Sequence, residues 1–468
     1  MTFKMTIDGQ SVAGQSALRV VNPATAKVFA QAPDCTRAEL DSAVDAARRA
    51  FPKWAARPLE DRRNLMIAFA DAIAARADEL ANLLTREQGK PLNDARSEVA
   101  ALVGVIKTHA RIDLPVHVAE DGPDRRVETR HLPLGVVGAI SPWNYPLLLA
   151  AFKIAPALLT GNTMVLKPSP FTPLATLLVG EISVGILPDG VFNVVSGGDD
   201  LGPWITEHPG IDKISFTGST QTGRRVMASA SSTLKRLTLE LGGNDAAIVL
   251  PDVDVETTAE KLFWSAFMNN GQVCIATKRL YVHDAIYDRM AEALSAYAAN
   301  TPMGDGATPG VRLGPINNRP QHDRIAGLIR ESHAEGHRFL TPCGPHEGDG
   351  FFSPVVLIDN PPDTSRLVRE EQFGPILPLL RYHDIDEVVA RANDVDVGLA
   401  GSVWAADDEV AIGVARRLDT GTVFINHGQY LSPFAAFGGR KQSGIGVENG
   451  VDGQREYVSP QTFVMAKR

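Results

Sequence analysis

Five short apolar runs alternate with helical segments from Leu134 onward: GVVGAI (135–140), TMVLKP (163–168), VFNVVSG (191–197), DKISFTGS (212–219) and RLTLELGG (236–243). The segments between them have apolar residues at helical spacing, as in PLLLAAFKIAPALL (146–159). Near-continuous apolar strands joined by helical crossovers are typical of a parallel sheet that helices cover on both faces. The sequence therefore predicts an α/β fold. In such a sheet, ligands bind at the carboxyl ends of the strands.

The flanking segments extend this picture. Residues 40–110 have the spacing of amphipathic helices, and the polar segment 113–131, DLPVHVAEDGPDRRVETRH, follows them. Its alternating valines and charges predict an exposed hairpin that contacts another subunit, although a plain surface loop fits as well. From Asp245 the pattern restarts with AAIVL (246–250) and continues to about Asn426. This restart predicts a second α/β domain.

Composition narrows the classes of function. The 468 residues include 46 Lys and Arg against 55 Asp and Glu, so the net charge of −9 offers no basic field for nucleic acid or an anionic membrane. Three widely separated cysteines favour a reducing compartment. The first residues lack the pattern of a signal peptide, and Lys153 and Pro156 interrupt the most apolar stretch. We expect a cytoplasmic protein with no membrane segment.

Two strand ends have features of an anion or nucleotide site. Gly218, Ser219 and Gly223 lie where a strand turns into a helix, and unobstructed amides at a helix N-terminus suit a pyrophosphate. Such turns are also common without a ligand, and this one is not a GxGxxG motif. Lys167 could bond a ribose hydroxyl or a phosphate, or it could be a solvated surface lysine.

Three polar residues elsewhere are candidates for chemistry, and each also has a purely structural interpretation. Cys274, in FMNNGQVCIAT (267–277), has no neighbouring Cys or His to suggest a metal site or a disulfide, and a buried inert thiol is its simplest interpretation. Glu240 follows an apolar strand and either caps the next turn or acts as a general base with a raised pKa. Asn144, in SPWNYP (141–146), either donates to an oxyanion or closes the turn.

Taken together and in order, the motifs resemble the NAD(P)-dependent aldehyde dehydrogenase superfamily. The resemblance extends from Asn22-Pro23 to the C-terminus and rests on a combination that is highly specific. Its motifs are Trp143-Asn144-Tyr145-Pro146, Lys167-Pro168-Ser169, Phe216-Thr217-Gly218-Ser219-Thr220, Glu240-Leu241-Gly242-Gly243-Asn244, Gly271-Gln272-Val273-Cys274, Glu371-Gln372-Phe373-Gly374-Pro375 and Phe437-Gly438-Gly439-Arg440-Lys441-Gln442-Ser443-Gly444.

The resemblance implies a catalytic role for three residues. Cys274, as thiolate, would attack the aldehyde carbonyl, and the Asn144 amide with the Cys274 backbone N–H would hold the oxyanion. The resulting intermediate would transfer hydride to the nicotinamide and become a thioester. Glu240 would activate the water that hydrolyses this thioester. The product would be the free carboxylic acid.

The resemblance also implies cofactor contacts for NAD or NADP, with no metal. Glu371 could instead be a solvated charge and Phe373 a core residue, while Lys441 and Ser443 are interpreted as structural. The predicted cofactor residues are Trp143, Lys167, Ser169, Gly218, Ser219, Gly223, Glu371 and Phe373. Pro170 stands where relatives that prefer NAD often carry an acid, and without that acid nothing repels a 2′-phosphate. We therefore expect the use of both NAD and NADP.

The resemblance implies three structural parts. A Rossmann-like dinucleotide-binding domain would comprise 1–113 and 132–242, and an α/β catalytic domain 243–444. A small β oligomerisation element would comprise 114–131 and 445–468. This element would pair with a neighbouring subunit, so we expect a homodimer or a homotetramer.

The substrate is expected to be a hydrophobic aldehyde, aromatic or medium-chain aliphatic. Phe152 stands where relatives that handle succinate semialdehyde carry an arginine. An apolar tunnel is predicted from Leu149, Phe152, Met268, Leu431 and Phe437, each of which could instead be plain core.

Four alternatives remain open at this stage. Two are enzymes of the same superfamily, a succinate semialdehyde type and a CoA-acylating type, although the latter typically lacks a base equivalent to Glu240. A cysteine hydrolase would need an activating histidine, and no recognisable partner motif surrounds the histidines. A non-catalytic binding protein on the same fold is the fourth.

Overall fold

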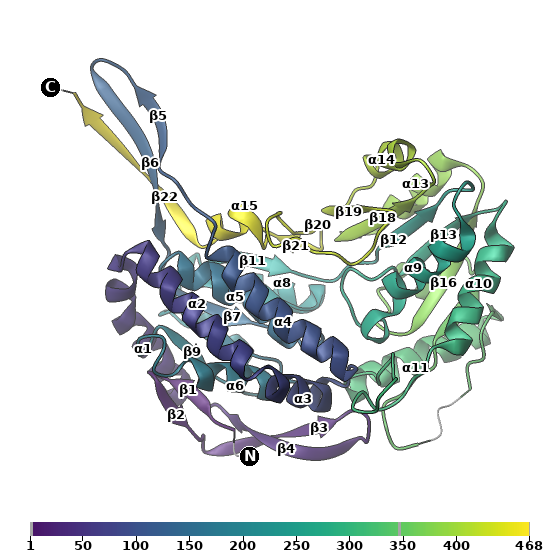
Figure 1. Cartoon of the computed structure of the whole chain (residues 1–468), viewed down its shortest axis with the longest axis horizontal. Helices are drawn as coiled ribbons and strands as arrows, with labels where there is room; N and C mark the ends of the chain where they lie inside the picture. Colours follow the sequence, from purple (N-terminus) through teal and green to yellow (C-terminus); the bar gives the residue numbers. More distant parts are fainter. Residues whose placement is uncertain (1–2, 345–347, 468) are drawn as a thin grey trace.

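The computed structural model describes residues 3–344 and 348–467 and contains two lobes and a projecting arm (Figure 1). The first lobe is built on an eight-stranded sheet with the order β2-β1-β9-β8-β7-β10-β11-β21. Its five central strands are parallel and coincide with the five apolar runs: β9 (Phe192–Val194), β8 (Thr163–Lys167), β7 (Val136–Ile140), β10 (Lys213–Thr217) and β11 (Arg236–Glu240). The predicted α/β class with a Rossmann-like sheet is confirmed.

Helices cover this sheet, and local sequence explains where several of them begin. Thr36 and Glu39 form a reciprocal capping box at the start of α1, and Pro146 occupies the first turn of α5. The helix α5 is buried on nearly all sides, which explains its continuous apolar sequence. The helices of this lobe are α1 (Arg37–Ala56), α2 (Leu59–Ala75), α3 (Ala77–Gln88), α4 (Leu92–His109), α5 (Pro146–Leu159), α6 (Leu174–Ser183), α7 (Leu201–Glu207), α8 (Thr220–Ala230) and the 3₁₀ turn η1 (Ser231–Thr233).

The second lobe contains the other large sheet, with the order β14-β15-β16-β13-β12-β18-β19. Its strands are β12 (Ala246–Val249), β13 (Arg279–His283), β14 (Arg338–Phe339), β15 (Val356–Asp359), β16 (Ile376–Tyr382), β18 (Ala400–Trp404) and β19 (Thr422–Ile425), parallel except for β14. Its helices are α9 (Val255–Phe267), η2 (Met268–Gly271), α10 (Tyr287–Asn300), α11 (Arg319–Ala334), α12 (Arg366–Arg369), α13 (Ile385–Asn393) and α14 (Asp408–Ala415).

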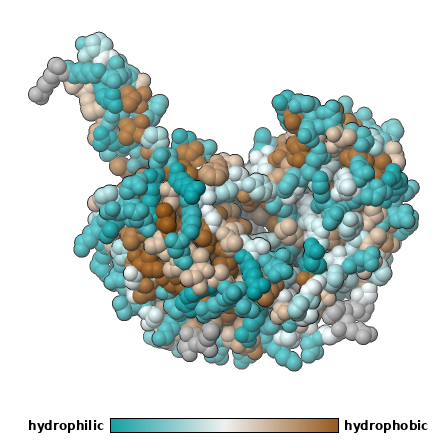
Figure 2. Space-filling model, viewed as in Figure 1, coloured by the Kyte–Doolittle hydropathy of each residue, from teal (hydrophilic) through white to brown (hydrophobic). Residues whose placement is uncertain are grey.

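The arm is a three-stranded antiparallel sheet that leaves the first lobe (Figure 1). The predicted exposed hairpin is present as β5 (His117–Asp121) and β6 (Arg125–Pro133), and β22 (Val458–Ala466) pairs along the whole of β6. The arm exposes apolar side chains among polar ones (Figure 2). Val464 is 70% exposed. Such exposure on a projecting sheet is typical of an interaction surface.

The short elements join these parts. Two hairpins, β1 (Met5–Ile7) with β2 (Gln10–Val12) and β3 (Ser16–Asn22) with β4 (Lys27–Asp34), lie in the N-terminal part. In the C-terminal part, β17 (Val397–Gly398) pairs with β20 (Arg440–Lys441), and α15 (Gly450–Arg455) precedes the arm. The strand β21 (Gly444–Ile445) pairs antiparallel with β11, so the chain returns to the first sheet after building the second. The sequence did not predict this return.

The topology determines where a site can form. The parallel strands β7, β8, β10 and β11 all end at one edge of the first sheet, and polar residues follow each of them. That edge faces the second lobe. Within residues 3–344 and 348–467, no helix has the length and apolar character needed to cross a membrane.

Candidate functional site

A cavity of about 960 Å³ lies between the lobes, at the carboxyl ends of the first sheet's strands. Figure 2 shows the recess where the lobes meet. The first lobe contributes the turn after β7, the β10–α8 turn and the residues that follow β11, while the second contributes Cys274 and the segment around Glu371. The predicted site residues that line it are Trp143, Asn144, Leu149, Gly218, Ser219, Cys274, Glu371 and Phe373. The fold thus brings together motifs that lie far apart in the sequence.

Cys274 follows a tight turn. Asn269, Asn270 and Gly271 have consecutive positive φ angles of 51°, 57° and 73°. A Cβ on Gly271 would lie 2.3 Å from the carbonyl oxygen of Gly374, so only glycine lets the two segments approach. The Asn-Asn-Gly sequence is a local signal for this turn because these residues tolerate left-handed backbone. The turn places Cys274, a residue of intermediate exposure, in the lining of the cavity.

The surroundings of Cys274 keep its thiol protonated. Burial raises the pKa of this thiol to about 12, and the carboxylates of Glu371 and Asp245 add to the effect. Lys278 acts in the opposite direction. The ammonium of Lys278 donates to the carbonyl oxygen of Val273, one residue before the cysteine, at 2.6 Å.

Asn144 is held close to the cysteine loop. Its side-chain Nδ2 donates to the carbonyl oxygen of Gln272 at 3.0 Å. Its own carbonyl oxygen accepts from Asn269 Nδ2 at 3.1 Å and from Lys90 Nζ at 2.9 Å. Because an amide nitrogen carries two hydrogens, the second N–H of Asn144 is available to the cavity that this residue lines.

Glu240 is the last residue of β11 and lies behind the cavity rather than in its lining. It is 3% exposed, and among the described residues neither carboxyl oxygen has a hydrogen-bond partner. Burial raises its pKa well above the usual value, Glu448 raises it further, and Lys153 opposes both. Lys153 donates to Glu448 Oε1 at 2.6 Å and to Thr217 Oγ1 at 2.7 Å. Glu240 therefore belongs to a buried group of charges that no single motif revealed.

The β10–α8 turn has the features expected of a phosphate-binding turn. Ser219 caps α8, its Oγ accepting from the Thr222 N–H at 3.3 Å. Gly218 lies over the Phe216 ring, where a Cβ would come within 2.5 Å. Gly223 does not line the cavity, because it packs inside the lobe, where a Cβ would lie 2.5 Å from Leu241 Cδ2.

Lys167 and Ser169 lie at the end of β8, outside the lining of the main cavity. Lys167 is only 5% exposed, so it is not a solvated surface lysine. Burial lowers the pKa of its ammonium to about 8, while Asp199 and Asp34 oppose the shift. Within the described residues, the Lys167 ammonium makes one hydrogen bond, to the adjacent Pro168 carbonyl, and this bond is long at 3.4 Å. A buried ammonium with so weak a contact has donors free for a ligand.

Glu371 and Phe373 line the opposite side of the cavity. Glu371 Oε1 accepts from the Gly243 N–H at 3.3 Å, and burial raises its pKa to about 7 against the influence of Lys278. Phe373 packs edge-on against Trp143, with ring centroids 5.3 Å apart. A Cβ on Gly242 would lie 2.3 Å from Glu371 Oε2, so glycine is needed for this approach.

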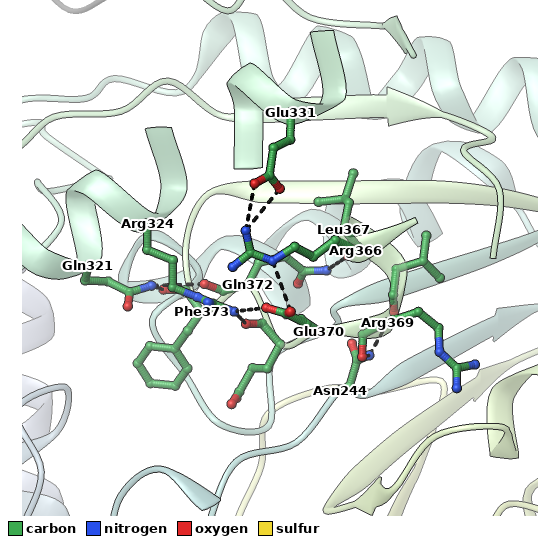
Figure 3. A network of polar contacts seen from close by, with 12 residues as sticks. Asn244, Gln321, Arg324, Glu331, Arg366, Leu367, Arg369, Glu370, Gln372 and Phe373 are labelled. Atoms are coloured by element: carbon green, nitrogen blue, oxygen red, sulfur yellow. Dashed lines mark hydrogen bonds and ion pairs between the residues drawn. The ribbon is translucent and has the colours of Figure 1, made fainter. Parts of the chain in front are cut away.

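A polar network holds the Glu371–Phe373 segment in place (Figure 3). Gln321 Nε2 donates to the carbonyl oxygens of Gln372 and Phe373, both at 2.9 Å. Arg324 donates to the Glu370 carboxylate and to the Glu371 carbonyl, also at 2.9 Å. Sequence reasoning missed Gln321 and Arg324 because α11 has no motif that marks them.

The five predicted tunnel residues separate into two groups. Leu149 lines the cavity. Leu431 and Phe437 lie outside its lining, but Phe437 belongs to the small apolar cluster against which Leu431 and Cys274 both pack. Phe152 does not line the cavity, because it is 2% exposed and packs in the core of the first lobe. Met268 is 38% exposed and also lies outside the lining.

Lys441 and Ser443 have structural contacts. Ser443 Oγ donates to the carbonyl of Gly242 at 2.7 Å and accepts from the N–H of Gly398 at 2.9 Å. Lys441 Nζ donates to the carbonyls of Asn393 and Val395. Both therefore act as ties between segments.

Comparison with known proteins gives a consistent result. The model of the aldehyde dehydrogenase family matches residues 10–463. A Pseudomonas protein described as "Probable aldehyde dehydrogenase" is 42% identical over all of this chain and 95% of its own length. The succinate-semialdehyde dehydrogenase [NADP(+)] GabD of Escherichia coli K12 is 37% identical over 94% of this chain and 93% of its own. The phenylacetaldehyde dehydrogenase of Pseudomonas fluorescens is 36% identical over 100% and 96%.

Solved structures agree with the sequence relatives. Betaine aldehyde dehydrogenase from Staphylococcus aureus, in complex with NAD⁺, superposes with a TM-score of 0.95 at 32% identity. The match covers 99% of this chain and 95% of that structure. The similarity therefore includes both lobes and the arm.

Proposed function

This chain belongs to the aldehyde dehydrogenase family, and from that premise we propose that Cys274 carries the covalent step by which it oxidises an aldehyde to the carboxylic acid. The enzyme uses NAD or NADP, as the family does. The observation that carries the assignment is the position of Cys274, partly exposed on the cavity wall with Asn144 beside it. A buried inert thiol would not face a cavity of this size.

The proposed chemistry begins with the cysteine. The thiol loses its proton, and the sulfur attacks the aldehyde carbon to form a tetrahedral thiohemiacetal. Lys278 is the cation that favours the thiolate in this site. The second N–H of Asn144 and the backbone N–H of Cys274 would stabilise the oxyanion, and losing one such donor costs about 10²–10³ in rate.

The cavity fits a dinucleotide. The amides at the start of α8 can receive a diphosphate, and the Lys167 ammonium has donors free for a ribose hydroxyl. Glu371, on the far wall, would bond the second ribose, while Trp143 and Phe373 would pack nearby. A bound oxidised nicotinamide would supply the acceptor for the hydride that leaves the thiohemiacetal, and Cys274 would then carry the acyl group as a thioester.

Glu240 is proposed as the base for thioester hydrolysis. Its buried, unpartnered carboxyl group must turn from its position behind the cavity toward Cys274, where it can take a proton from water. The raised pKa supports this role, because a carboxylate of higher pKa is a stronger base. Hydrolysis releases the acid and restores the thiol.

The substrate is proposed to be a hydrophobic aldehyde. Leu149, Leu431 and Phe437 give the region around Cys274 an apolar character. Two of the three arginines that line the cavity are paired with carboxylates, Arg324 with Glu370 and Arg369 with Asp394. The third, Arg224, donates to the neutral amide of Gln442. Among the described lining arginines, a distal carboxylate, as in succinate semialdehyde, would find only Arg224 without a carboxylate partner.

Use of both cofactors is proposed for a related reason. Pro170 offers no carboxylate beside Lys167, and the hydroxyl of Ser169 lies two residues from the buried ammonium. A 2′-phosphate and a 2′-hydroxyl can both accept from an ammonium and a hydroxyl donor.

Assembly into a dimer or tetramer through the arm completes the proposal, because Val464 and its neighbours would otherwise expose apolar surface to water.

The test of the chemistry is single-turnover kinetics of a Glu240→Gln variant. The variant should still acylate and release about one reduced cofactor per active site in a burst, after which turnover slows severely because hydrolysis lacks its base. Absorbance of the reduced nicotinamide measures both phases. Cys274→Ala is the control and should give no burst. Steady-state turnover of Glu240→Gln at the wild-type rate would remove Glu240 from this role.

A panel of aldehydes tests the specificity. Benzaldehyde and hexanal should be oxidised with a higher kcat/KM than succinate semialdehyde, with either cofactor. A preference for NAD above about 10³-fold, roughly 4 kcal/mol in transition-state terms, would contradict the proposed dual use. Equal or better turnover of succinate semialdehyde would contradict the hydrophobic pocket.

A further inference from the structure

A buried ion pair lies behind Asn144. Lys90 Nζ donates to Glu98 Oε2 at 2.5 Å and to the backbone carbonyl oxygen of Asn144 at 2.9 Å. Both charged side chains are completely buried. The Lys90 ammonium also lies 3.6 Å from the centroid of the Tyr145 ring, which immediately follows Asn144. The pair thus touches the turn that carries the proposed oxyanion donor, without lining the cavity itself.

Glu98 fixes the other side of the same turn. Its Oε1 accepts from the N–H groups of Leu147 and Leu148, at 2.9 and 3.2 Å. These are first-turn amides of α5, a helix whose own N-cap residue makes no side-chain cap. Glu98, which projects from α4, therefore replaces the missing cap and completes the attachment of the Asn144 turn.

A closed circuit of hydrogen bonds connects this pair with the cysteine loop. Asn144 Nδ2 donates to the Gln272 carbonyl at 3.0 Å, and Gln272 Oε1 accepts from the Asn317 N–H at 2.8 Å. Asn317 Nδ2 donates to the Gln88 carbonyl at 3.2 Å, and Gln88 Oε1 accepts from the Lys90 N–H at 2.9 Å. All five side chains are buried. The circuit therefore links the two lobes through Asn144.

We propose that Lys90 and Glu98 are positioning residues that hold the free N–H of Asn144 at the oxyanion of the Cys274 adduct. The inference rests on the proposed oxyanion role of Asn144. Loss of the Lys90 ammonium would leave the Asn144 carbonyl with one donor, Asn269, instead of two. A donor must lie within hydrogen-bond distance of the developing charge, and a misplacement of about 1 Å can cost about 10² in rate.

Stability alone does not account for this pair. Replacing a buried ion pair with apolar groups of similar volume is often neutral or stabilising, because two charges lose their hydration on burial. Burial indeed lowers the pKa of Lys90, and Glu98 works against that shift. The two charges instead fix the geometry of a single turn. The Lys90 ammonium holds the Asn144 carbonyl, and the Glu98 carboxylate holds the amides of Leu147 and Leu148.

The experiment is a double-mutant cycle between Lys90→Met and Asn144→Ala. Lys90→Met should lower kcat about 10- to 100-fold with a smaller change in the KM for aldehyde, because the lost interaction matters in the transition state. In the Asn144→Ala background, the same substitution should change kcat less than about threefold, since coupled residues are not additive. The neutral pair Lys90→Met/Glu98→Gln, which leaves no unpaired buried charge, should show the same loss of kcat.

Lys235→Met is the matched control. Lys235 Nζ also holds a backbone carbonyl, that of His208 at 2.9 Å, but it precedes β11 and so lies at the opposite end of the sheet from the cavity. Its kcat should stay within about twofold of wild type, as expected for an independent site. The NAD⁺ dissociation constant, from quenching of tryptophan fluorescence, and the thermal midpoint are measured for every variant.

The outcomes separate this inference from the proposed function. If Asn144→Ala keeps the wild-type kcat, the oxyanion role of Asn144 fails, and the inference fails with it. If Asn144→Ala is slow but Lys90→Met and the neutral pair turn over normally, only the positioning role is overturned. An equal loss of kcat on adding Lys90→Met to either background also overturns it, because Lys90 would then act independently of Asn144. Where Lys90→Met does not fold, the neutral pair gives the answer.

Discussion

The thiol of Cys274 lies in surroundings that oppose its ionisation. Burial and the carboxylates of Glu371 and Asp245 raise its pKa to about 12, and Lys278 only partly compensates. Because the thiolate is the reactive form, the resting cysteine is poorly nucleophilic near neutral pH. Attack on a substrate then requires a proton acceptor or a change in the local charge.

This environment predicts the pH dependence of alkylation. Below the pKa of about 12, the thiolate fraction of Cys274 rises about tenfold for each pH unit, so its alkylation by iodoacetamide should keep rising from pH 7 to pH 9 without a plateau. Mass spectrometry of the peptide that contains Cys274 measures this rate separately from those of the other two cysteines. A plateau near pH 8 would contradict the raised pKa.

The Glu371→Gln variant provides a matched comparison. Removing this negative charge should lower the pKa of the Cys274 thiol and accelerate its alkylation at pH 8. Glu256→Gln, on the exposed surface of α9, is the control and should leave the alkylation rate unchanged. A slower reaction in Glu371→Gln would mean that Glu371 acts as a base for the thiol.

At the scale of residues, the sequence identified those candidate site residues that lie in recognisable motifs. Cys274, Asn144 and Glu371 were predicted, and the fold brings them to one cavity. Gln321 and Lys90 were not, because their importance comes from contacts with segments about 50 residues away in the chain. Isolated polar residues on helices have no signature until the partner segment is known.

The helix α5 shows the same limit at the scale of elements. Its sequence predicted a helical crossover between two strands, and α5 is buried on nearly every side. A helix that is apolar all round has no hydrophobic stripe from which to infer its orientation. Leu149 consequently lines the cavity, whereas Phe152, three residues later, packs in the core. By contrast, the strand runs were predictable, since parallel strands buried on both faces need only continuous apolar residues.

The tie made by Ser443 gives a prediction for stability. Ser443→Ala would leave the Gly242 carbonyl and the Gly398 N–H buried without a side-chain partner, at a cost of about 1–3 kcal/mol. The thermal midpoint at matched protein concentration should fall accordingly. Ser97→Ala is the control, because Ser97 is exposed on α4 and its hydroxyl donates to the Asn93 carbonyl in the preceding turn of the same helix. An unchanged midpoint in Ser443→Ala would mean that water replaces both contacts.

On the scale of the whole molecule, the arm predicts the assembly state. Val464→Asp would place a charge in the exposed apolar face of β22, which should separate the proposed dimer or tetramer into smaller species. Light scattering after size-exclusion chromatography measures the mass. Val410→Asp, at an exposed valine of α14 in the second lobe, is the control because it introduces the same charge away from the arm. An unchanged mass of the Val464→Asp variant would contradict assembly through this face of the arm.

The sequence did not predict how the two lobes are connected. Alternating strands and helices predicted two α/β units, but not that β21 returns to pair with Leu239 and Glu240 of the first sheet. That pairing joins residues about 200 positions apart and involves only two residues of β21. So short a strand has no detectable pattern in the sequence, and only the assembled fold reveals it.

The position of the arm has a practical consequence for handling the protein. The chain leaves the molecule along β22 at the tip of the arm, whereas its N-terminal residues emerge near β3 and β4 on the far side (Figure 1). Lys467 is fastened there by an ion pair with Asp121. An affinity tag, a fluorophore or an attachment to a chip would crowd the arm if fused after Arg468. Fused ahead of the first residue, the same label would leave the arm clear.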